Sequence, residues 1–297
     1  MMLSRPSFLA FLVAFAGCGG SPPPAAPTPQ PVAPEGTVAS ADGVPIFYRS
    51  TGSGEPTVVL VHCWGCSSDE WTDTIGPLAA THRVVALDLA GHGRSGKART
   101  AWTVPSFVGD IRAVIDHLGV TKAIIVGHSM SGTIAIETAV ELPGKVVGVV
   151  PVDALHDAVA AQAQDPAEIA TFFAGMRASF APTVEALIRR IMPKTADPEL
   201  IKRILAFELA NDPAIAIPIL ESNWTFPIRD AFAKVTVPII AINADLFPTN
   251  VAANRTLAPQ YQVRLIEGVG HWPMLEAPQR FNALLTQAVA DIAAATK

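Results

Sequence analysis

Ser129 is the residue of this sequence best placed for nucleophilic chemistry. It lies in Gly127-His128-Ser129-Met130-Ser131, between a β-branched run and an apolar-rich segment of helical character. A strand that turns at once into a helix about a serine is the layout of a nucleophile elbow, which raises the hydroxyl above the sheet. Such a turn brings backbone very close, so small residues are needed two places on either side, and both are small here. The spacing therefore predicts that Ser129 is a nucleophile.

A histidine that could activate this serine occurs near the end of the chain. His271 follows an expected strand at 262–266 through a Gly-Val-Gly loop and precedes an expected final helix at 278–294. This arrangement places a mobile imidazole at the edge of the cleft above the sheet. There it could take the Ser129 proton and return it to a leaving group.

Composition sets the class of protein that must position these residues. The chain has 297 residues, half of them hydrophobic, which is enough for one large core or a core with an inserted subdomain. The net charge is −5, only 16% of the residues are charged, and no run of lysines or arginines occurs. We therefore expect no nucleic-acid partner.

The first 35 residues indicate export and anchoring rather than folding. Arg5 precedes an apolar run at 8–18 that is too short to span a bilayer but typical of a signal peptide, which we place at 1–17. The run ends in Phe15-Ala16-Gly17-Cys18, which resembles a bacterial lipobox with Phe15 in place of the usual Leu. Cys18 is thus expected to be lipidated, and the Pro-rich segment 18–35 to act as a tether.

This anchor would be the protein's only contact with a membrane, and it predicts a location in the cell envelope. No acidic residue follows Cys18, which by resemblance to lipoprotein sorting favours the bacterial outer membrane over the inner. A plain secreted protein is the alternative.

From residue 36 onward, strand and helix patterns alternate. This order predicts βαβ crossovers and an α/β fold with a doubly wound, mostly parallel sheet. An antiparallel hairpin at the sheet edge is expected at 38–49, around an Asp-Gly turn. The expected strands are 57–62, 83–89, 123–126, 146–152, 237–243 and 262–266, and the expected helices are 68–80, 105–118, 133–140, one from about 249, and 278–294.

The alternation is interrupted between residues 156 and 230. Several helical stretches broken by prolines carry aromatic, Met and Ile side chains there, with no strand pattern between them. We interpret 156–230 as a helical cap inserted between two parts of the core, 36–155 and 231–297. Open α/β sheets bind ligands at the strand ends, so the cap is expected to cover the site and to contribute apolar contacts to a substrate.

Four motifs, in the order in which they occur, resemble those of α/β-hydrolases with a helical cap, over nearly all of the chain from Gly36 to the end. The motifs are His62-Cys63-Trp64-Gly65, Asp88-Leu89-Ala90-Gly91-His92-Gly93-Arg94-Ser95, Gly127-His128-Ser129-Met130-Ser131, and Gly270-His271-Trp272-Pro273-Met274-Leu275-Glu276. The resemblance implies that Ser129 is the nucleophile and His271 the general base. It also implies that His62 and His92 are structural, and His128 is expected to point away from the cleft.

The resemblance leaves two candidates for the carboxylate that must orient His271. In the family this acid usually follows the strand that corresponds to 237–243, a few residues after a Gly. Here Ala244 replaces that Gly, yet Asp245 precedes the next helix at nearly the usual distance, so we favour Asp245. Asp153, which ends the strand before the cap, occupies an alternative site that some family members use.

The oxyanion hole requires two preorganised backbone amides. The family pattern assigns one to Met130, which follows the nucleophile, and the other to Trp64, two residues after the strand-ending His62. Cys63 stands where the family usually has Gly, so the second amide lies between Cys63 and Trp64. We expect Cys63 and Cys66 to be small packing residues, with a local disulfide as the alternative.

These observations predict a serine hydrolase that cleaves a small carboxylic ester or lactone with an apolar portion through an acyl-enzyme. None of the histidines falls into metal-ligand spacing with another His, Cys or carboxylate, so no metal or cofactor is expected. The same triad could instead serve carbon–carbon bond hydrolysis or perhydrolysis, because fold and triad do not fix the substrate. A non-catalytic, surface-anchored binding protein is a third reading. The sequence gives no oligomeric state.

Overall fold

The computed structural model describes residues 34–161 and 165–296. The expected signal peptide, the Cys18 lipidation site and nearly all of the tether therefore lie outside the described residues, and they stay predictions. Within the described residues, none of the helices combines the length and the hydropathy needed to cross a bilayer.

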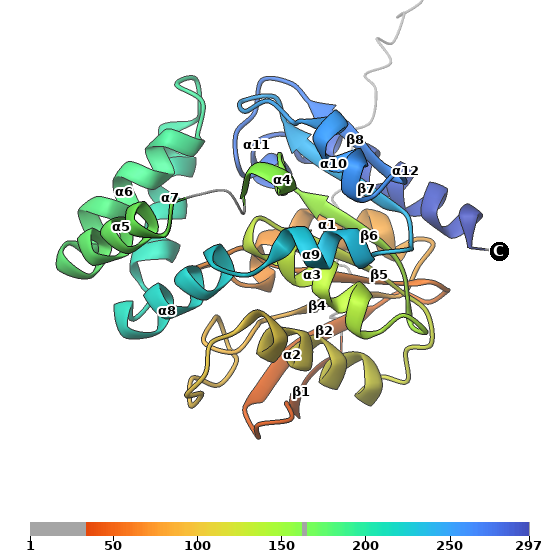
Figure 1. Cartoon of the computed structure of the whole chain (residues 1–297). Coiled ribbons are helices and arrows are strands. Elements are labelled where there is room, and N and C mark those ends of the chain that lie inside the picture. Colours follow the sequence, from red (N-terminus) through yellow and green to blue (C-terminus); the bar gives the residue numbers. More distant parts are fainter. Residues whose placement is uncertain (1–33, 162–164, 297) are drawn as a thin grey trace, which may run out of the picture. The chain divides into compact units, whose positions relative to one another are not determined.

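The core of the described chain is an eight-stranded sheet (Figure 1). Its strands run in the order β1-β2-β4-β3-β5-β6-β7-β8; β1 and β2 are antiparallel to their neighbours and the remaining pairs are parallel. The strands are β1 Glu35–Ala39, β2 Pro45–Thr51, β3 Thr57–Val61, β4 Val84–Leu87, β5 Ala123–His128, β6 Val146–Val152, β7 Ile239–Ala244 and β8 Tyr261–Ile266. The predicted edge hairpin and the mostly parallel α/β sheet are confirmed.

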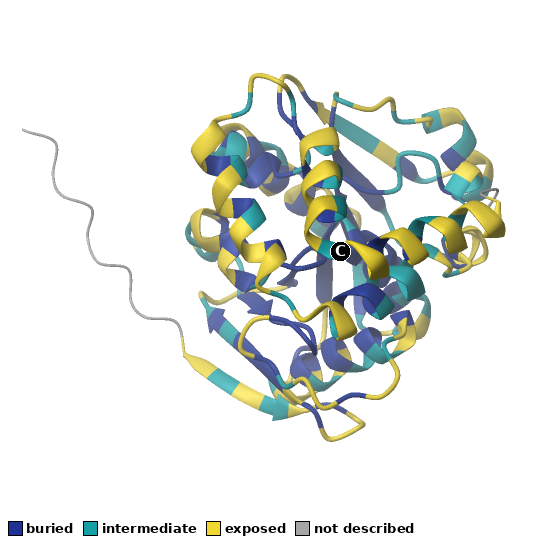
Figure 2. Cartoon of the chain, turned by 90° about the vertical axis from the view of Figure 1, so that its left-hand side faces the viewer, coloured by how far each residue is buried: buried dark blue, intermediate teal, exposed yellow. Residues whose placement is uncertain are grey.

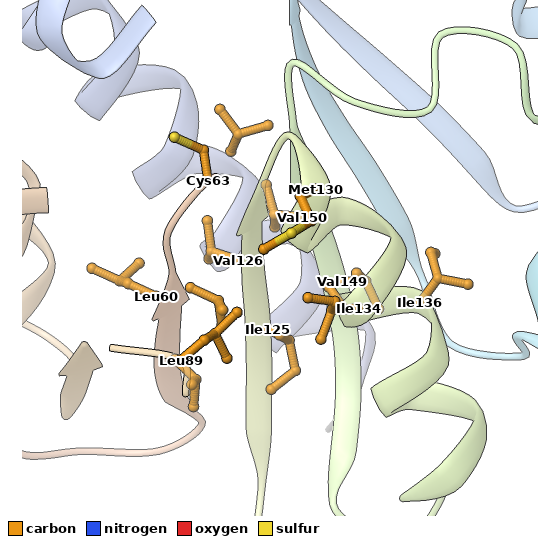
Figure 3. Packing of buried hydrophobic residues seen from close by; sticks show 14 of the residues in the cluster. Leu60, Cys63, Leu89, Ile125, Val126, Met130, Ile134, Ile136, Val149 and Val150 are labelled. Atoms are coloured by element: carbon orange, nitrogen blue, oxygen red, sulfur yellow. The ribbon is translucent and has the colours of Figure 1, made fainter. Parts of the chain in front are cut away.

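The central strands are buried along their whole length. Every residue of β3, β4, β5 and β7 is buried, as expected for strands covered on both faces by helices. Branched side chains from neighbouring strands interlock with those of the helix that follows β5 (Figure 3): Leu60, Ile125, Val126, Ile134, Val149 and Val150. This packing makes the carboxyl ends of β3, β5 and β6 a rigid platform for the site.

Helices cover both faces of the sheet. On one face α1 (Thr72–Ala79), α11 (Pro273–Glu276) and α12 (Pro278–Ala295) contact one another, and on the other α2 (Val104–His117) and α3 (Met130–Glu141) do so. A short 3-10 helix, η1 (Ser68–Trp71), leads into α1, and α10 (Val251–Leu257) connects β7 to β8. In Figure 2 the central strands are dark blue, the edge strands β1 and β8 are largely yellow and teal, and the outer sides of the helices are yellow. The connection from β3 to β4, through α1, runs across the sheet in the opposite direction to the connection from β4 to β5, through α2. Because both connections are right-handed, α1 and α2 lie on opposite faces of the sheet.

The connection between β6 and β7 is the predicted helical insertion. Its described residues form helices and no strand: α4 Ala158–Ala161, α5 Pro166–Ala178, α6 Phe180–Ile191, α7 Pro198–Leu209, α8 Pro213–Trp224 and α9 Ile228–Lys234. Prolines begin α5, α7 and α8, and the aspartate before each one caps the helix by accepting a backbone N–H. These caps explain why several short helices form in place of one long helix.

Three of the hydrogen bonds between the cap and the core reach the loops that carry candidate site residues. The indole Nε1 of Trp64 donates to the carbonyl of Ala216 on α8 at 2.7 Å. The side-chain amide of Asn211 donates to the Gly65 carbonyl at 2.8 Å. The backbone N–H of His271 donates to the Ile191 carbonyl at the end of α6, at 3.0 Å. The cap is therefore connected to the same loops that carry the candidate site residues.

Gly127 allows the turn after β5 to close. A Cβ atom built on Gly127 would lie 2.0 Å from the backbone oxygen of Ser131, which cannot move without opening the first turn of α3. We expect Gly127→Ala to lower the free energy of unfolding by about 1–3 kcal/mol or more, as overpacking does elsewhere. Chemical denaturation followed by circular dichroism measures this loss.

Gly144 gives the matched control, since no atom lies within 4 Å of its built Cβ and its φ is not positive. Gly144→Ala should leave the unfolding midpoint nearly unchanged. Equal midpoints for the Gly127→Ala and Gly144→Ala variants would contradict the close packing described for the turn.

Candidate active site

Ser129 lies on a strained turn between β5 and α3. Its φ is +55° and its ψ is −115°, a backbone conformation that residues other than glycine rarely adopt. The hydroxyl of Ser131, two residues on, donates to the carbonyl of His62 at 2.5 Å and thereby ties the turn to the end of β3. The predicted nucleophile elbow is present, and it holds the Ser129 side chain at the carboxyl end of the sheet.

His271 brings its imidazole against this serine. The Nε2 atom of His271 lies 2.7 Å from Ser129 Oγ, although 142 residues separate the two in the sequence. The other ring nitrogen, Nδ1, lies 2.5 Å from Oδ2 of Asp153. These contacts fit an Nδ1–H that donates to the carboxylate and an Nε2 that accepts the serine proton.

Asp153, and not Asp245, is the carboxylate beside His271. The sequence analysis favoured Asp245 as the residue that contacts His271, and that prediction is wrong. The Oδ1 atom of Asp245 instead accepts the backbone N–H of Gly268 at 2.9 Å. Asp245 also continues the pairing of β7 with β8, because its N–H donates to the carbonyl of Ile266 at 3.3 Å. These bonds hold its carboxylate on the β8 side of the sheet, whereas His271 faces the end of β6.

The backbone at the end of β6 presents Asp153 to the histidine. Its φ is +43°, and its Oδ1 accepts the N–H of Ala244 at 2.9 Å while Oδ2 faces His271. A second imidazole, that of His156, lies 3.4 Å from Oδ1. Sequence reasoning did not single out His156; its place three residues after a strand-ending aspartate was the available signal.

The electrostatics of this group favour an ionised aspartate and a neutral histidine. Burial alone would raise the pKa of Asp153, but the imidazoles of His156 and His271 beside the carboxylate outweigh it, and the pKa falls well below its ordinary value. Burial lowers the pKa of His271, and Asp153 offsets this only in part. A neutral imidazole beside a serine hydroxyl is the resting state that a general base requires.

The loop that carries His271 is fixed from two sides. Glu276 accepts the backbone N–H groups of Gly270 at 2.8 Å and of Trp272 at 3.1 Å, on either side of the histidine. His128 Nε2 lies 2.6 Å from the carbonyl of His271 and so donates to it. His128 was expected to point away from the cleft; it does not reach Ser129, but it positions His271 from behind.

Glu70 contacts His128 and so completes the set of residues that hold the His271 loop. The sequence analysis did not identify Glu70. Both of its carboxylate oxygens lie 3.3 Å from His128 Nδ1. Burial would lower the pKa of His128, but the Glu70 carboxylate and the hydrogen bonds raise it above its ordinary value. The raised pKa favours the protonated form of His128, which lies behind His271. Glu70 and His128 come from separate elements, η1 and β5, so no local pattern marks their contact.

The Glu70 contact also separates the two candidates for the second oxyanion amide. The backbone N–H of Cys63 donates to Glu70 Oε1 at 3.2 Å and is thus engaged. Trp64 supplies the next amide of the same loop, and Met130 begins α3, where the first N–H groups have no intrahelical acceptor. Figure 3 shows Cys63 and Met130 at the same end of the strands. The geometry favours Trp64 and Met130 as the pair of donors.

Cys63 and Cys66 are joined by a disulfide, with Cα atoms 5.3 Å apart. The expectation that they are unpaired packing residues is therefore wrong, and the structure has the local disulfide that was the alternative. Positive φ on this loop falls on Gly65, at +72°, and not on Cys63, so the cysteine in place of the family's Gly carries no such strain. The bond closes the loop that presents the Trp64 amide.

The two remaining histidines of the motifs are structural, as expected. His62 Nε2 accepts the N–H of Leu89 at 2.9 Å, and its Nδ1 lies 2.7 Å from the Cys63 carbonyl, to which it donates. Burial lowers the pKa of His92 to about 3, and its Nδ1 lies 3.1 Å from the Ala90 carbonyl. The bonds of His62 connect the end of β3 to the loop after β4.

Comparison with known proteins agrees with this architecture. The chain belongs to the alpha/beta hydrolase family, whose model matches residues 58–284. A solved structure of an N-acyl homoserine lactone degrading enzyme superimposes with a TM-score of 0.73 at 27% identity, covering 84% of this chain and 98% of that one. Proteins similar to this chain thus include one named as a lactone degrading enzyme and one named as a non-heme haloperoxidase, from Rhodococcus erythropolis.

Two curated relatives match shorter stretches. A dihydrolipoyllysine-residue acetyltransferase component of the acetoin cleaving system, from Cupriavidus necator, is 38% identical over 37% of this chain and 30% of its own length. A bifunctional esterase/perhydrolase from Acinetobacter calcoaceticus is 39% identical over 33% of this chain and 36% of its own length. The chain thus matches about a third of each of these relatives.

The lowered pKa of His271 predicts how the reactivity of Ser129 depends on pH. Only the neutral imidazole can accept the serine proton, so the rate of labelling by a fluorophosphonate should rise with pH through a midpoint below the ordinary histidine value of about 6.5 and then level off. Labelling is measured by intact mass over a series of buffers.

Ser129→Ala is the control for this measurement and should take up no label. A midpoint clearly above about pH 7 would contradict a buried, neutral His271. Labelling of the Ser129→Ala variant at the wild-type rate would mean that the reactive serine is a different one.

Proposed function

We propose that this protein is a serine hydrolase that cleaves a small carboxylic ester or lactone with an apolar portion. The observation that carries the proposal is the continuous chain of contacts from Ser129 Oγ through His271 to Asp153, built on an elbow with positive φ. Nucleophile, base and orienting acid in this geometry are the parts required for acyl transfer.

In the first half of the reaction, Ser129 Oγ attacks the carbonyl carbon of the substrate as its proton passes to Nε2 of His271. The carbonyl oxygen gains negative charge and is held by the amides of Met130 and Trp64. The imidazolium that forms is stabilised by the ionised Asp153 at Nδ1. His271 then gives the proton to the leaving alcohol, and an acyl group stays on Ser129.

In the second half, a water molecule takes the place of the alcohol. Nε2 of His271 accepts a proton from the water as its oxygen attacks the acyl carbon, and the proton then returns to Ser129 Oγ. Asp153 remains a carboxylate throughout, as its lowered pKa favours. For a lactone, the alcohol and acid products are the two ends of one opened chain.

The apolar portion of the substrate is inferred from what the cap brings to the site. Trp64 packs edge-on against Phe180, the first residue of α6, with ring centroids 6.3 Å apart. The buried Met130 and Met192 lie next to the nucleophile and at the end of α6, respectively. Apolar side chains on both sides of the candidate oxyanion hole favour an acyl or lactone chain over a charged group. The lactone degrading relative supports the same substrate class.

Perhydrolysis is the second candidate, favoured by the esterase/perhydrolase name of one relative and the haloperoxidase name of another. Hydrogen peroxide would then replace water in attacking the acyl group, with the same three residues. Both candidates need an acyl group on Ser129, so they differ only in the second half of the reaction.

A panel of short-chain and long-chain p-nitrophenyl esters and lactones tests the proposal. We expect turnover by the wild-type protein on at least one ester or lactone and none by Ser129→Ala. Adding peroxide and following peracid formation separates perhydrolysis from hydrolysis. A folded wild-type protein that turns over no substrate of the panel and takes up no fluorophosphonate would favour the non-catalytic binding protein instead.

Separate Asn substitutions identify the acid. Asp153→Asn should lower kcat by about 10³–10⁴-fold, since the amide neither fixes the Nδ1–H tautomer nor stabilises the imidazolium. The Asp245 carboxylate accepts the backbone N–H of Gly268 and lies away from His271, so Asp245→Asn should keep kcat within about threefold. The opposite ranking of the two variants would overturn the assignment of Asp153.

A further inference from the structure

The loop that holds the Cys63–Cys66 disulfide meets a buried acid from the cap. Glu208, on α7, is only 2% exposed, and its Oε1 lies 3.9 Å from Cys66 Sγ. The sulfur atoms of both cysteines and a carboxylate oxygen of Glu208 all lie within 4.8 Å of one another. Sequence spacing gave no sign of this cluster, because Glu208 follows Cys66 by 142 residues.

Glu208 has no evident reason to be buried beside a disulfide. Its Oε2 has no hydrogen-bond partner among the residues that the structure describes, and the sulfurs of a disulfide carry no proton to donate. Burying a carboxyl group without a partner costs about 1–3 kcal/mol or more. Burial, and next the nearby Glu70 carboxylate, raise the pKa of Glu208 well above its ordinary value. An orphaned oxygen in this position indicates a partner that the described residues do not supply.

The loop is shaped to admit this carboxylate. A Cβ atom built on Gly65, between the cysteines, would lie 1.8 Å from Glu208 Oε2, and the positive φ of Gly65 is itself one that favours glycine. The bond from Asn211 to the Gly65 carbonyl holds the end of α7 against the same loop. Two cysteines with two residues between them, facing a carboxylate, form a donor set of the kind that binds zinc.

We propose that, when the disulfide is reduced, Cys63, Cys66 and Glu208 bind a thiophilic divalent cation of the zinc class, which takes the place of the disulfide in closing this loop. Two thiolates and one carboxylate would supply three ligands, and water the fourth position of a tetrahedral ion. The site is separate from the Ser129 triad and does not rest on the proposed hydrolysis.

The exchange balances with a trialkylphosphine as the reductant. The phosphine donates two electrons to break the sulfur–sulfur bond and becomes its oxide by taking the oxygen of one water, whose two protons pass to the sulfurs. Binding of the cation then releases both thiol protons to solvent as the two metal–sulfur bonds form, and the Glu208 carboxylate supplies the metal–oxygen bond.

A pocket of about 480 Å³ reaches one of the three proposed ligands, Cys66. It is lined by Gly65, Cys66 and Glu70 on the core side and by residues of α7 and the following turn, including Phe207 and Asn211, but not by Ser129 or His271. Glu70 and His128 also lie within ligand distance of Cys63. Because that pair is already engaged in hydrogen bonds with each other, we assign the third ligand to the unpartnered Glu208.

Cobalt(II) tests the site directly, because thiolate ligands give it a charge-transfer absorption band that oxygen ligands do not. The full chain is reduced with the phosphine, freed of it by gel filtration under argon, and titrated with Co²⁺. We expect one Co²⁺ per reduced chain, with the charge-transfer band present, and its displacement by Zn²⁺. The oxidised protein should show no band.

Glu208→Gln and Glu199→Gln form a matched pair on α7, because the side chain of Glu199 is exposed at 80%. We expect at least tenfold weaker Co²⁺ binding for reduced Glu208→Gln and wild-type affinity for reduced Glu199→Gln. Cys66→Ser removes one of the two thiolate ligands, so its Co²⁺ charge-transfer band should be weaker than that of the reduced wild-type protein. Near-ultraviolet circular dichroism monitors the fold of each reduced protein.

Three results would overturn the proposal. The first is a reduced wild-type protein, with two titratable thiols and a native spectrum, that shows no charge-transfer band. The second is a Glu208→Gln variant that binds Co²⁺ as tightly as Glu199→Gln. The third is a reduced protein that loses its native spectrum and does not regain it when Zn²⁺ is added. In that case the cation would fail to replace the disulfide.

Discussion

The candidate site depends on one buried charge, the carboxylate of Asp153. An ionised carboxylate in a protein interior must be paired, and this one is held by the imidazoles of His271 and His156 and by the backbone N–H of Ala244. These partners come from three separate regions of the chain. Their meeting requires the ends of β6 and β7 to be in register and the His271 loop to fold back over them. The main contribution of the sheet to the candidate site is therefore to fix the position of the Asp153 carboxylate.

The environment behind His271 shows the same use of buried polar groups. Glu276 engages the amides on both sides of the histidine, and His128, paired with Glu70, donates to its carbonyl. Each of these bonds satisfies a backbone group that would otherwise be buried without a partner, and together they restrict the loop to one position. The cap adds the Ile191 carbonyl as acceptor for the His271 N–H. Movement of the cap would thus act on the position of the candidate base as well as on access to the site.

Those parts of the fold and the site that are encoded locally could be predicted from sequence. The strands around Ser129, the small residues of its turn and the Gly-rich approach to His271 each have a pattern within a few residues. The choice between Asp153 and Asp245 has no such pattern. Both follow a strand, and only the pairing of β7 with β8, which directs Asp245 toward Gly268, decides which carboxylate reaches His271. Glu70 and Glu208 were missed for the same reason, since each is defined by a partner on a distant element.

The central claim is that acyl groups of substrate pass through Ser129. Rapid quenching of the wild-type protein with an activated ester, followed by intact mass and peptide mapping, tests it most directly. The account predicts one acyl group per chain, located on Ser129, that decays as product appears. Turnover with no acylated intermediate at any quench time, or with the acyl group on another residue, would contradict it.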